Sequence, residues 1–134
     1  MVVTGRINKV AFYCRMNHKD RDYTQFHEEI QRVLDEKYGE TNWEMQLFFE
    51  VASGADSNRK EFARLKAKIK AKEIDVVVTV KAAMLARVWN QFIEFMKLCE
   101  ENEVAVICIR EPEDAYPIYK RIQLFIQEYF EGCD

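Results

Sequence analysis

Short apolar segments alternate with longer amphipathic segments along the chain. Residues 74–80 contain five valines and isoleucines, interrupted only by Asp75 and Thr79. A run this continuous is typical of a strand that is buried on both faces of a sheet. The other segments with the length and apolar content of strands are 9–14, 43–51 and 104–109.

The amphipathic segments have the spacing of helices. Over 23–38, apolar residues recur at helical intervals among charged ones, and Gly39 supplies a stop. Another helix is expected to open at Asn58, because Asn58 and Glu61 match a capping arrangement. The remaining predicted features are the apolar stripe of that helix (Phe62, Leu65 and Ile69), a loop over 52–58, and helices over 85–101 and 118–130.

Strands that alternate with helices over short connections indicate an α/β fold. We expect three layers, α/β/α, around a mostly parallel sheet of four or five strands. The chain has 134 residues and is 49% hydrophobic, which is enough apolar material for one core. No linker, repeat or low-complexity segment divides the sequence, so residues 1–134 are expected to form a single domain.

Charge and composition exclude several classes of protein. The net charge is −3 with both signs mixed along the chain, so no general attraction to nucleic acid or to an anionic membrane is expected. No apolar run approaches the roughly 18 residues that span a bilayer, and residues 1–9 lack the apolar core of a signal peptide. We therefore expect a cytoplasmic protein without a membrane partner.

The cysteines, Cys14, Cys99, Cys108 and Cys133, form no C-x-x-C pair. The first three lie within strand or helix patterns, where a free thiol acts as a small apolar group. We expect no disulfide framework, no metal site and no cofactor.

Ligands of an open parallel sheet bind beyond the carboxyl ends of its strands, so the residues just after each strand are informative. Residues 13–17 are Tyr-Cys-Arg-Met-Asn, residues 53–54 are Ser-Gly, and residues 59–65 are Arg-Lys-Glu-Phe-Ala-Arg-Leu. The strand at 74–78 runs into Lys-Ala-Ala-Met-Leu-Ala-Arg at 81–87. In this order they resemble the catalytic domain of the serine recombinases, the resolvase and invertase family. The corresponding family motifs are Tyr-x-Arg-Val-Ser, Ser-Gly, Arg-Pro-Gly-Phe-x-x-Leu and Lys-Leu-Asp-Arg-Leu-Gly-Arg.

The resemblance implies a resolvase-like fold and a role in site-specific DNA recombination, DNA integration or a mobile element. Family members cut DNA by attack of a serine hydroxyl on a backbone phosphate, while arginines stabilise the charge on the phosphoryl oxygens. Arg15, Arg59 and Arg87 match three of these arginines. We expect their guanidinium groups to converge and to bind a phosphate.

The resemblance fails at residues that perform the cleavage. Asn17 stands at the position of the nucleophilic serine, and a carboxamide nitrogen has no accessible nucleophilic lone pair. Ala83 and Met84 stand where the family has an aspartate and an arginine. Lys60 and Glu61 replace a proline and a glycine, and the added carboxylate would repel a phosphate. The sequence therefore predicts a degenerate site that is not competent for cleavage.

No other residue is an evident substitute for the nucleophile. Ser53 and Ser57 occupy a loop before a helix, where serine is typically a turn or cap residue. Thr79 lies inside a buried strand, and Cys14 is expected to point into the core because side chains alternate along a strand. His18 has no nucleophile to serve as a base.

Two surfaces bear on possible partners. The helix over 118–130 carries more apolar residues than one stripe against a sheet requires, which fits either a wide core face or a dimer contact. DNA binding is expected to be weak without a further domain, and the expected protein partner is a second copy or a recombinase. The basic residues of the second helix are expected to form a solvated face: Arg64, Lys66, Lys68, Lys70 and Lys72.

These observations lead to the hypothesis of a catalytically silent serine-recombinase-like domain that acts as a dimerising or regulatory partner. Two alternatives stay open. An active recombinase fragment with a relocated nucleophile would form a covalent protein–DNA adduct. A small phosphate- or nucleotide-binding module would hold an anion among Arg15, Arg59 and Arg87.

Overall fold

A four-stranded parallel sheet lies at the centre of the computed structural model, which describes residues 7–16, 23–51, 59–86 and 89–110. The spatial order of the strands is β2-β1-β3-β4, and all three pairings are parallel. β1 pairs along its whole length with β2 and through its middle with β3. The predicted parallel α/β sheet is confirmed. Its strands are β1 (Asn8–Met16), β2 (Trp43–Val51), β3 (Val76–Thr79) and β4 (Ala105–Cys108).

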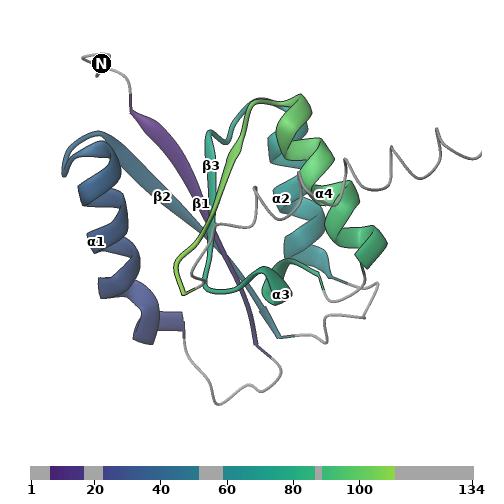
Figure 1. Cartoon of the computed structure of the whole chain (residues 1–134), viewed down its shortest axis with the longest axis horizontal. Helices are drawn as coiled ribbons and strands as arrows, with labels where there is room; N and C mark the ends of the chain where they lie inside the picture. The colour runs from purple at the N-terminus through teal and green to yellow at the C-terminus, as the bar shows by residue number, and fades with distance from the viewer. Residues whose placement is uncertain (1–6, 17–22, 52–58, 87–88, 111–134) are drawn as a thin grey trace, which may run out of the picture.

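Helices cover both faces of this sheet (Figure 1). α1 (His27–Tyr38), which the short 3-10 helix η1 (Tyr23–Phe26) precedes, packs on one face. α2 (Lys60–Lys70) and α4 (Trp89–Glu101) pack on the other. The described part of the chain thus has the predicted three layers.

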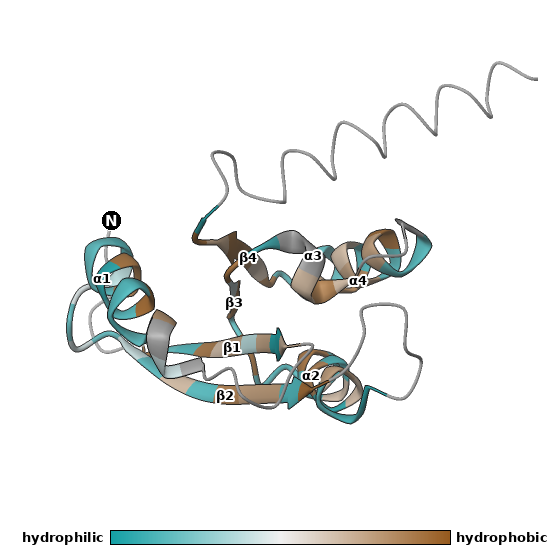
Figure 2. Cartoon of the chain, turned by 90° about the horizontal axis from the view of Figure 1, so that it is seen from below, coloured by the Kyte–Doolittle hydropathy of each residue, from teal (hydrophilic) through white to brown (hydrophobic). Residues whose placement is uncertain are grey.

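The side chains of β1 alternate between two apolar cores. Phe12 and Cys14 face α1 and join Leu34, whereas Tyr13 faces the opposite side and joins Leu65 of α2. Figure 2 shows apolar colouring on the strands and on α4, while α1 is largely hydrophilic. The prediction that Cys14 points into the core is confirmed, because this residue has no exposed surface.

The prediction of one continuous helix over 85–101 is wrong. A short helix, α3 (Ala82–Leu85), follows β3, and α4 begins only at Trp89. Leu85 and Phe92 lie seven positions apart and are buried in the same core, so the apolar spacing continues across the interruption. Periodicity alone therefore cannot reveal the break.

The residue that the sequence predicts at a helix end is found there for α1 but not for the other helices. α1 ends at Gly39, whose φ of 91° is a conformation that favours glycine. α2 and α4 are followed by Lys72 and Glu103 at φ values of 63° and 57°, where the sequence offers no glycine. The predicted cap residue Asn58 lies outside the described residues, and α2 has Arg59 at its N-cap with no side-chain cap bond.

Several other expectations concern residues that the structure does not describe, including the helix over 118–130, its dimer contact and Cys133. Cys14 and Cys99 are free and buried, and Cys108 is buried as well. In the described ranges, no helix has the length and apolar content needed to cross a membrane.

Candidate functional site

The carboxyl edge of the sheet brings together two of the arginines that the sequence singles out. Arg15 lies near the end of β1, and Arg59 immediately precedes α2. Each is only 5% exposed. Arg15 Nε donates a hydrogen bond to the backbone carbonyl oxygen of Met84 at 3.2 Å, and Arg59 Nη2 donates to the same oxygen at 3.1 Å. The two guanidinium groups therefore meet at a carbonyl oxygen of α3.

A second set of contacts links Arg59 to the two central strands. Nε and Nη2 of Arg59 donate to the Tyr13 hydroxyl oxygen at 3.2 and 2.7 Å. The Tyr13 hydroxyl in turn donates to the Glu50 carboxylate. That carboxylate lies 3.8 Å from Arg59 Nε, and both side chains are largely buried. Tyr13, Glu50 and Arg59 thus form a connected polar network across β1, β2 and the start of α2.

Glu50 also caps α2 from the neighbouring strand. Its two carboxylate oxygens accept hydrogen bonds from the backbone N–H groups of Glu61 and Phe62, both at 3.2 Å. These N–H groups lie in the first turn of the helix and have no partner within it. An anion at this position is also stabilised by the positive end of the helix dipole. Glu50 therefore performs the role that the sequence assigned to Asn58 and Glu61.

Burial determines the electrostatics of the network. The pKa of Tyr13 is raised, first because its hydroxyl is buried and second because it donates to the Glu50 carboxylate. The Arg59 guanidinium stacks over the Phe62 ring, with Cζ 3.9 Å from the ring centroid. Arg59 Nη1 is buried without a hydrogen-bond partner among the described residues.

Chemically, the edge combines buried guanidinium groups with the N-terminus of a helix, which is an arrangement suited to anions. Two acceptors already occupy it. The Glu50 carboxylate binds the helix N-terminus, and the Met84 carbonyl accepts from Arg15 and Arg59. Along the described segments, no group of three or more His, Cys, Asp or Glu side chains is arranged to hold a metal ion.

The family model described as "Resolvase, N terminal domain" matches residues 10–132 of the chain. The chain belongs to this family. It is a serine-recombinase domain of the kind associated with site-specific DNA recombination. None of the curated proteins compared with the chain matches it.

Solved structures of serine recombinases share the fold of this resolvase-family domain. The crystal structure of the N-terminal catalytic domain of TP901-1 integrase is 20% identical, with a TM-score of 0.69, over 91% of this chain and 98% of that one. A resolvase family site-specific recombinase from Streptococcus pneumoniae is 16% identical, with a TM-score of 0.64, over 94% and 95%. A serine recombinase from Sulfolobus solfataricus is 20% identical, with a TM-score of 0.58, over 93% and 86%.

The structure places only some of the family motif positions. Ala83 and Met84 lie in α3, and Met84 enters the site through its backbone carbonyl. Thr79 is fully buried in β3, as predicted. Outside the described residues lie Asn17, His18, Ser53, Ser57 and Arg87.

The role of Glu50 is absent from the sequence-based site, and Tyr13 entered it only as part of a motif. The available signal is that Glu50 puts a charge into the otherwise apolar end of the strand 47–51. Tyr13 pairs with Phe48 and faces the α2 side of the sheet, where a buried hydroxyl requires a partner. These two facts together would point to a polar pair beneath α2.

Proposed function

We propose that this resolvase-family domain does not cleave DNA and that it acts as a dimerising or regulatory partner in site-specific recombination. Residues 1–134 form a single domain in this proposal, and the apolar segment 118–130, for which the sequence predicts a helix, supplies the contact to a second copy or to a recombinase.

The first support is the chemistry of the positions that match the family motifs. An amide at Asn17 cannot form the covalent phosphoserine link that the family uses, because its nitrogen lone pair is delocalised into the carbonyl group. Ala83 and Met84 supply neither the carboxylate nor the guanidinium that stand at these positions in the family. The nucleophilic hydroxyl, the carboxylate and one guanidinium group of the family motifs are therefore all missing.

The observation that carries the proposal is the hydrogen bonding of the arginines. Arg15 and Arg59 are buried and both donate to the Met84 carbonyl oxygen. A DNA phosphate could accept these hydrogen bonds only in place of the Met84 carbonyl oxygen, so it would first have to displace α3. The arrangement therefore favours a structural role for these arginines over phosphate binding.

Both alternative functions lose support from the same region. Thr79 and Cys14 have no exposed surface, so neither can act as a relocated nucleophile on DNA without a large rearrangement. A phosphate-binding module centred on Arg15 and Arg59 would need their guanidinium groups to be accessible, and both residues are almost fully buried.

Restoring the missing groups tests the loss of cleavage. The wild-type chain, Asn17→Ser and the triple variant Asn17→Ser/Ala83→Asp/Met84→Arg would each be incubated with a supercoiled plasmid that carries a candidate recombination site. An active serine recombinase on its own site serves as the positive control. Denaturing electrophoresis should show no protein–DNA adduct for the wild type or the single variant. A covalent adduct with the wild-type chain would refute the proposal.

The partner role has its own measurement. Sedimentation of the full chain should give the mass of a dimer, and addition of the chain to a related active recombinase should change the rate of cleavage by that enzyme. A monomer at all concentrations, with no effect on the enzyme, would contradict the partner role while leaving the loss of cleavage intact.

A further inference from the structure

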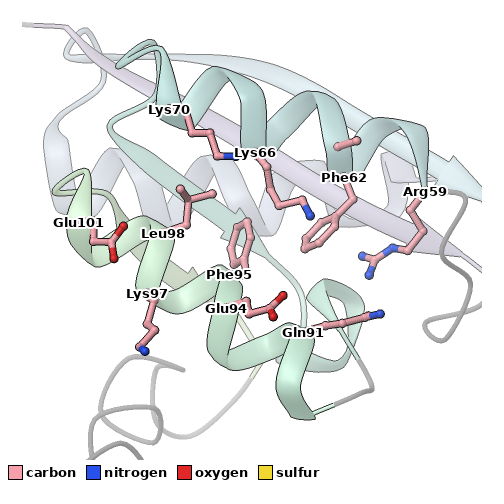
Figure 3. A pocket seen from close by; sticks show the side chains of 11 residues that line it. Arg59, Phe62, Lys66, Lys70, Gln91, Glu94, Phe95, Lys97, Leu98 and Glu101 are labelled. Atoms are coloured by element: carbon pink, nitrogen blue, oxygen red, sulfur yellow. The ribbon is translucent and has the colours of Figure 1, made fainter.

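A cleft lies between α2 and α4, and its lining includes Arg59 but neither Tyr13 nor Glu50. Its volume is about 520 Å³, within the size range of small-molecule sites. One wall is the stripe of α2 that includes Arg59, Phe62 and Lys66, and the other is the stripe of α4 that includes Gln91 and Glu94 (Figure 3). Residues three and four positions apart share one face of a helix, so each wall is a continuous stripe.

The charges of the cleft favour an anion. Four of its lining residues are basic and two are acidic, although the chain as a whole has a net charge of −3. Lys66 points into the space between the helices, whereas Lys97 points away from it (Figure 3). The charged lining residues are Arg59, Lys66, Lys70, Lys97, Glu94 and Glu101.

Two cations flank the same aromatic ring in this cleft. Arg59 Cζ lies 3.9 Å and Lys66 Nζ lies 5.0 Å from the centroid of the Phe62 ring. Within the described ranges, Lys66 forms no salt bridge, and the carboxylate beside Arg59 belongs to Glu50, outside the cleft lining. Two neighbouring positive charges without an acid between them leave a place for a ligand anion.

The Arg59 guanidinium group lies at one end of the cleft. The Arg59 side chain is only 4% exposed, and its Nη1 atom has no hydrogen-bond partner among the described residues. Figure 3 shows the guanidinium group at the end of the cleft, beside Phe62 and Gln91. Because the guanidinium group is buried, it adds positive charge to this end of the cleft without a direct contact to a ligand.

The opposite wall determines what kind of anion fits. Gln91 and Glu94 of α4 lie across from Arg59 and Phe62 (Figure 3). An amide supplies both a donor and an acceptor, and a carboxylate accepts hydrogen bonds from hydroxyl groups. Glu94 would repel a bare anion, but it suits a ligand that carries hydroxyl groups next to its phosphate.

We propose that the α2–α4 cleft binds a small organic phosphate with hydroxyl groups, of the sugar phosphate or nucleotide type. Lys66 holds the phosphate, while Gln91 and Glu94 bind the hydroxyl groups. The proposal does not depend on the loss of DNA cleavage, because no nucleophile takes part in it.

Isothermal titration of the full chain tests the proposal, with ribose 5-phosphate, adenosine monophosphate and inorganic phosphate as separate probes. Lys66→Met removes the charge from the cleft. Lys68→Met is the matched control, because Lys68 is an equally half-buried lysine of α2 that does not line the cleft. Circular dichroism establishes that both variants are folded.

At least one of the two esters should bind more tightly than inorganic phosphate. Lys66→Met should weaken that binding at least about tenfold, the range expected for a hydrogen bond to a charged group, and Lys68→Met should change it by less than about twofold. Binding of the ribose ester and the nucleotide alike would identify the sugar phosphate as the recognised part, whereas binding of the nucleotide alone would add the base.

Any of four results would overturn the proposal. Equal weakening by both lysine variants, or equal affinity for inorganic phosphate and the esters, would indicate an adventitious ion only. The absence of measurable binding by any probe would exclude the site. Binding of a duplex oligonucleotide that depends on Lys66, without binding of the esters, would assign the cleft to the DNA backbone instead.

Discussion

Among the described residues, Arg59 has many hydrogen-bond partners toward the sheet and few toward the cleft. Toward the sheet, Tyr13, Glu50 and the Met84 carbonyl satisfy the guanidinium group, and Glu50 also caps α2. Toward the cleft, Lys66 and Arg59 flank the Phe62 ring, and Arg59 Nη1 has no acceptor in the described part of the chain. A saturated network holds a structure in place, whereas unmatched charge next to a cavity is typical of a binding site.

This difference separates the structural contribution of Arg59 from any contribution to ligand binding. The arginine that resembles a phosphate ligand of the family now has protein acceptors on its sheet side. Its contribution on that side is to stability, and this contribution can be measured separately from any ligand.

The largest expected effect comes from Glu50→Ala. The substitution removes the carboxylate beside a buried guanidinium and the acceptor of two helix N–H groups. Urea denaturation should show a loss of about 3 kcal/mol in the free energy of unfolding, the low end for breaking a buried ion pair. The control Glu44→Ala, at an exposed position of the same strand, should cost less than about 0.5 kcal/mol. Equal losses in the two variants would refute the structural role of Glu50.

Tyr13→Phe should have the next largest effect. The ring remains packed against Phe62, but Arg59 loses one acceptor and Glu50 loses one donor. The expected cost is about 1–2 kcal/mol, because buried groups are left without a partner. A Tyr13→Phe variant as stable as the wild type in urea would show that the hydroxyl adds nothing to the network.

Stability should fall in alkaline solution. Burial raises the pKa of Cys14 from 9.0 to about 11 and that of Cys99 from 9.0 to about 12, and it also raises the pKa of Tyr13. The unfolded chain therefore releases these protons at lower pH than the folded chain, so stability present below pH 9 is lost as the pH rises above it.

The urea midpoint measured at pH 8 and at pH 10 tests this dependence. The free energy of unfolding should be lower at pH 10 than at pH 8 by an amount on the order of 1 kcal/mol. The double variant Cys14→Ala/Cys99→Ala should be less stable at both pH values, but its stability should differ less between them. A midpoint that does not change between pH 8 and pH 10 would contradict the assigned pKa directions.

The smallest expected effect on stability lies on the cleft side. Lys66→Met removes a charge that forms no salt bridge within the described residues, so the free energy of unfolding should change by less than about 0.5 kcal/mol. Lys68→Met should behave in the same way. A loss of more than about 1 kcal/mol in Lys66→Met alone would mean that the cleft is part of the stabilising framework.

The sequence predicts the sheet and its layers because local patterns encode them. The valine-rich segment 74–80 and the amphipathic segment 23–38 correspond to a central strand and to a helix on one face. The interruption between α3 and α4 is not predictable in this way, because Leu85 and Phe92 keep helical spacing across it.

The candidate site is predictable only where a motif marks it. The pattern identifies Arg15 and Arg59, but their shared acceptor is a backbone carbonyl, which has no sequence signature. Glu50 lies nine positions before Arg59 in the chain and acts through a contact between β2 and α2. Such long-range partners depend on the strand order, which single-sequence patterns do not specify.

The most direct test of the account is the search for a covalent intermediate with the wild-type chain. Purified protein would be incubated with labelled DNA that carries a candidate recombination site, and the denatured products would be resolved by electrophoresis and by intact-protein mass spectrometry. The account predicts no protein species with a mass increase from attached DNA, while the active recombinase used as a control on its own site shows one. A DNA adduct on the wild-type chain, at whichever residue it maps to, would contradict the account.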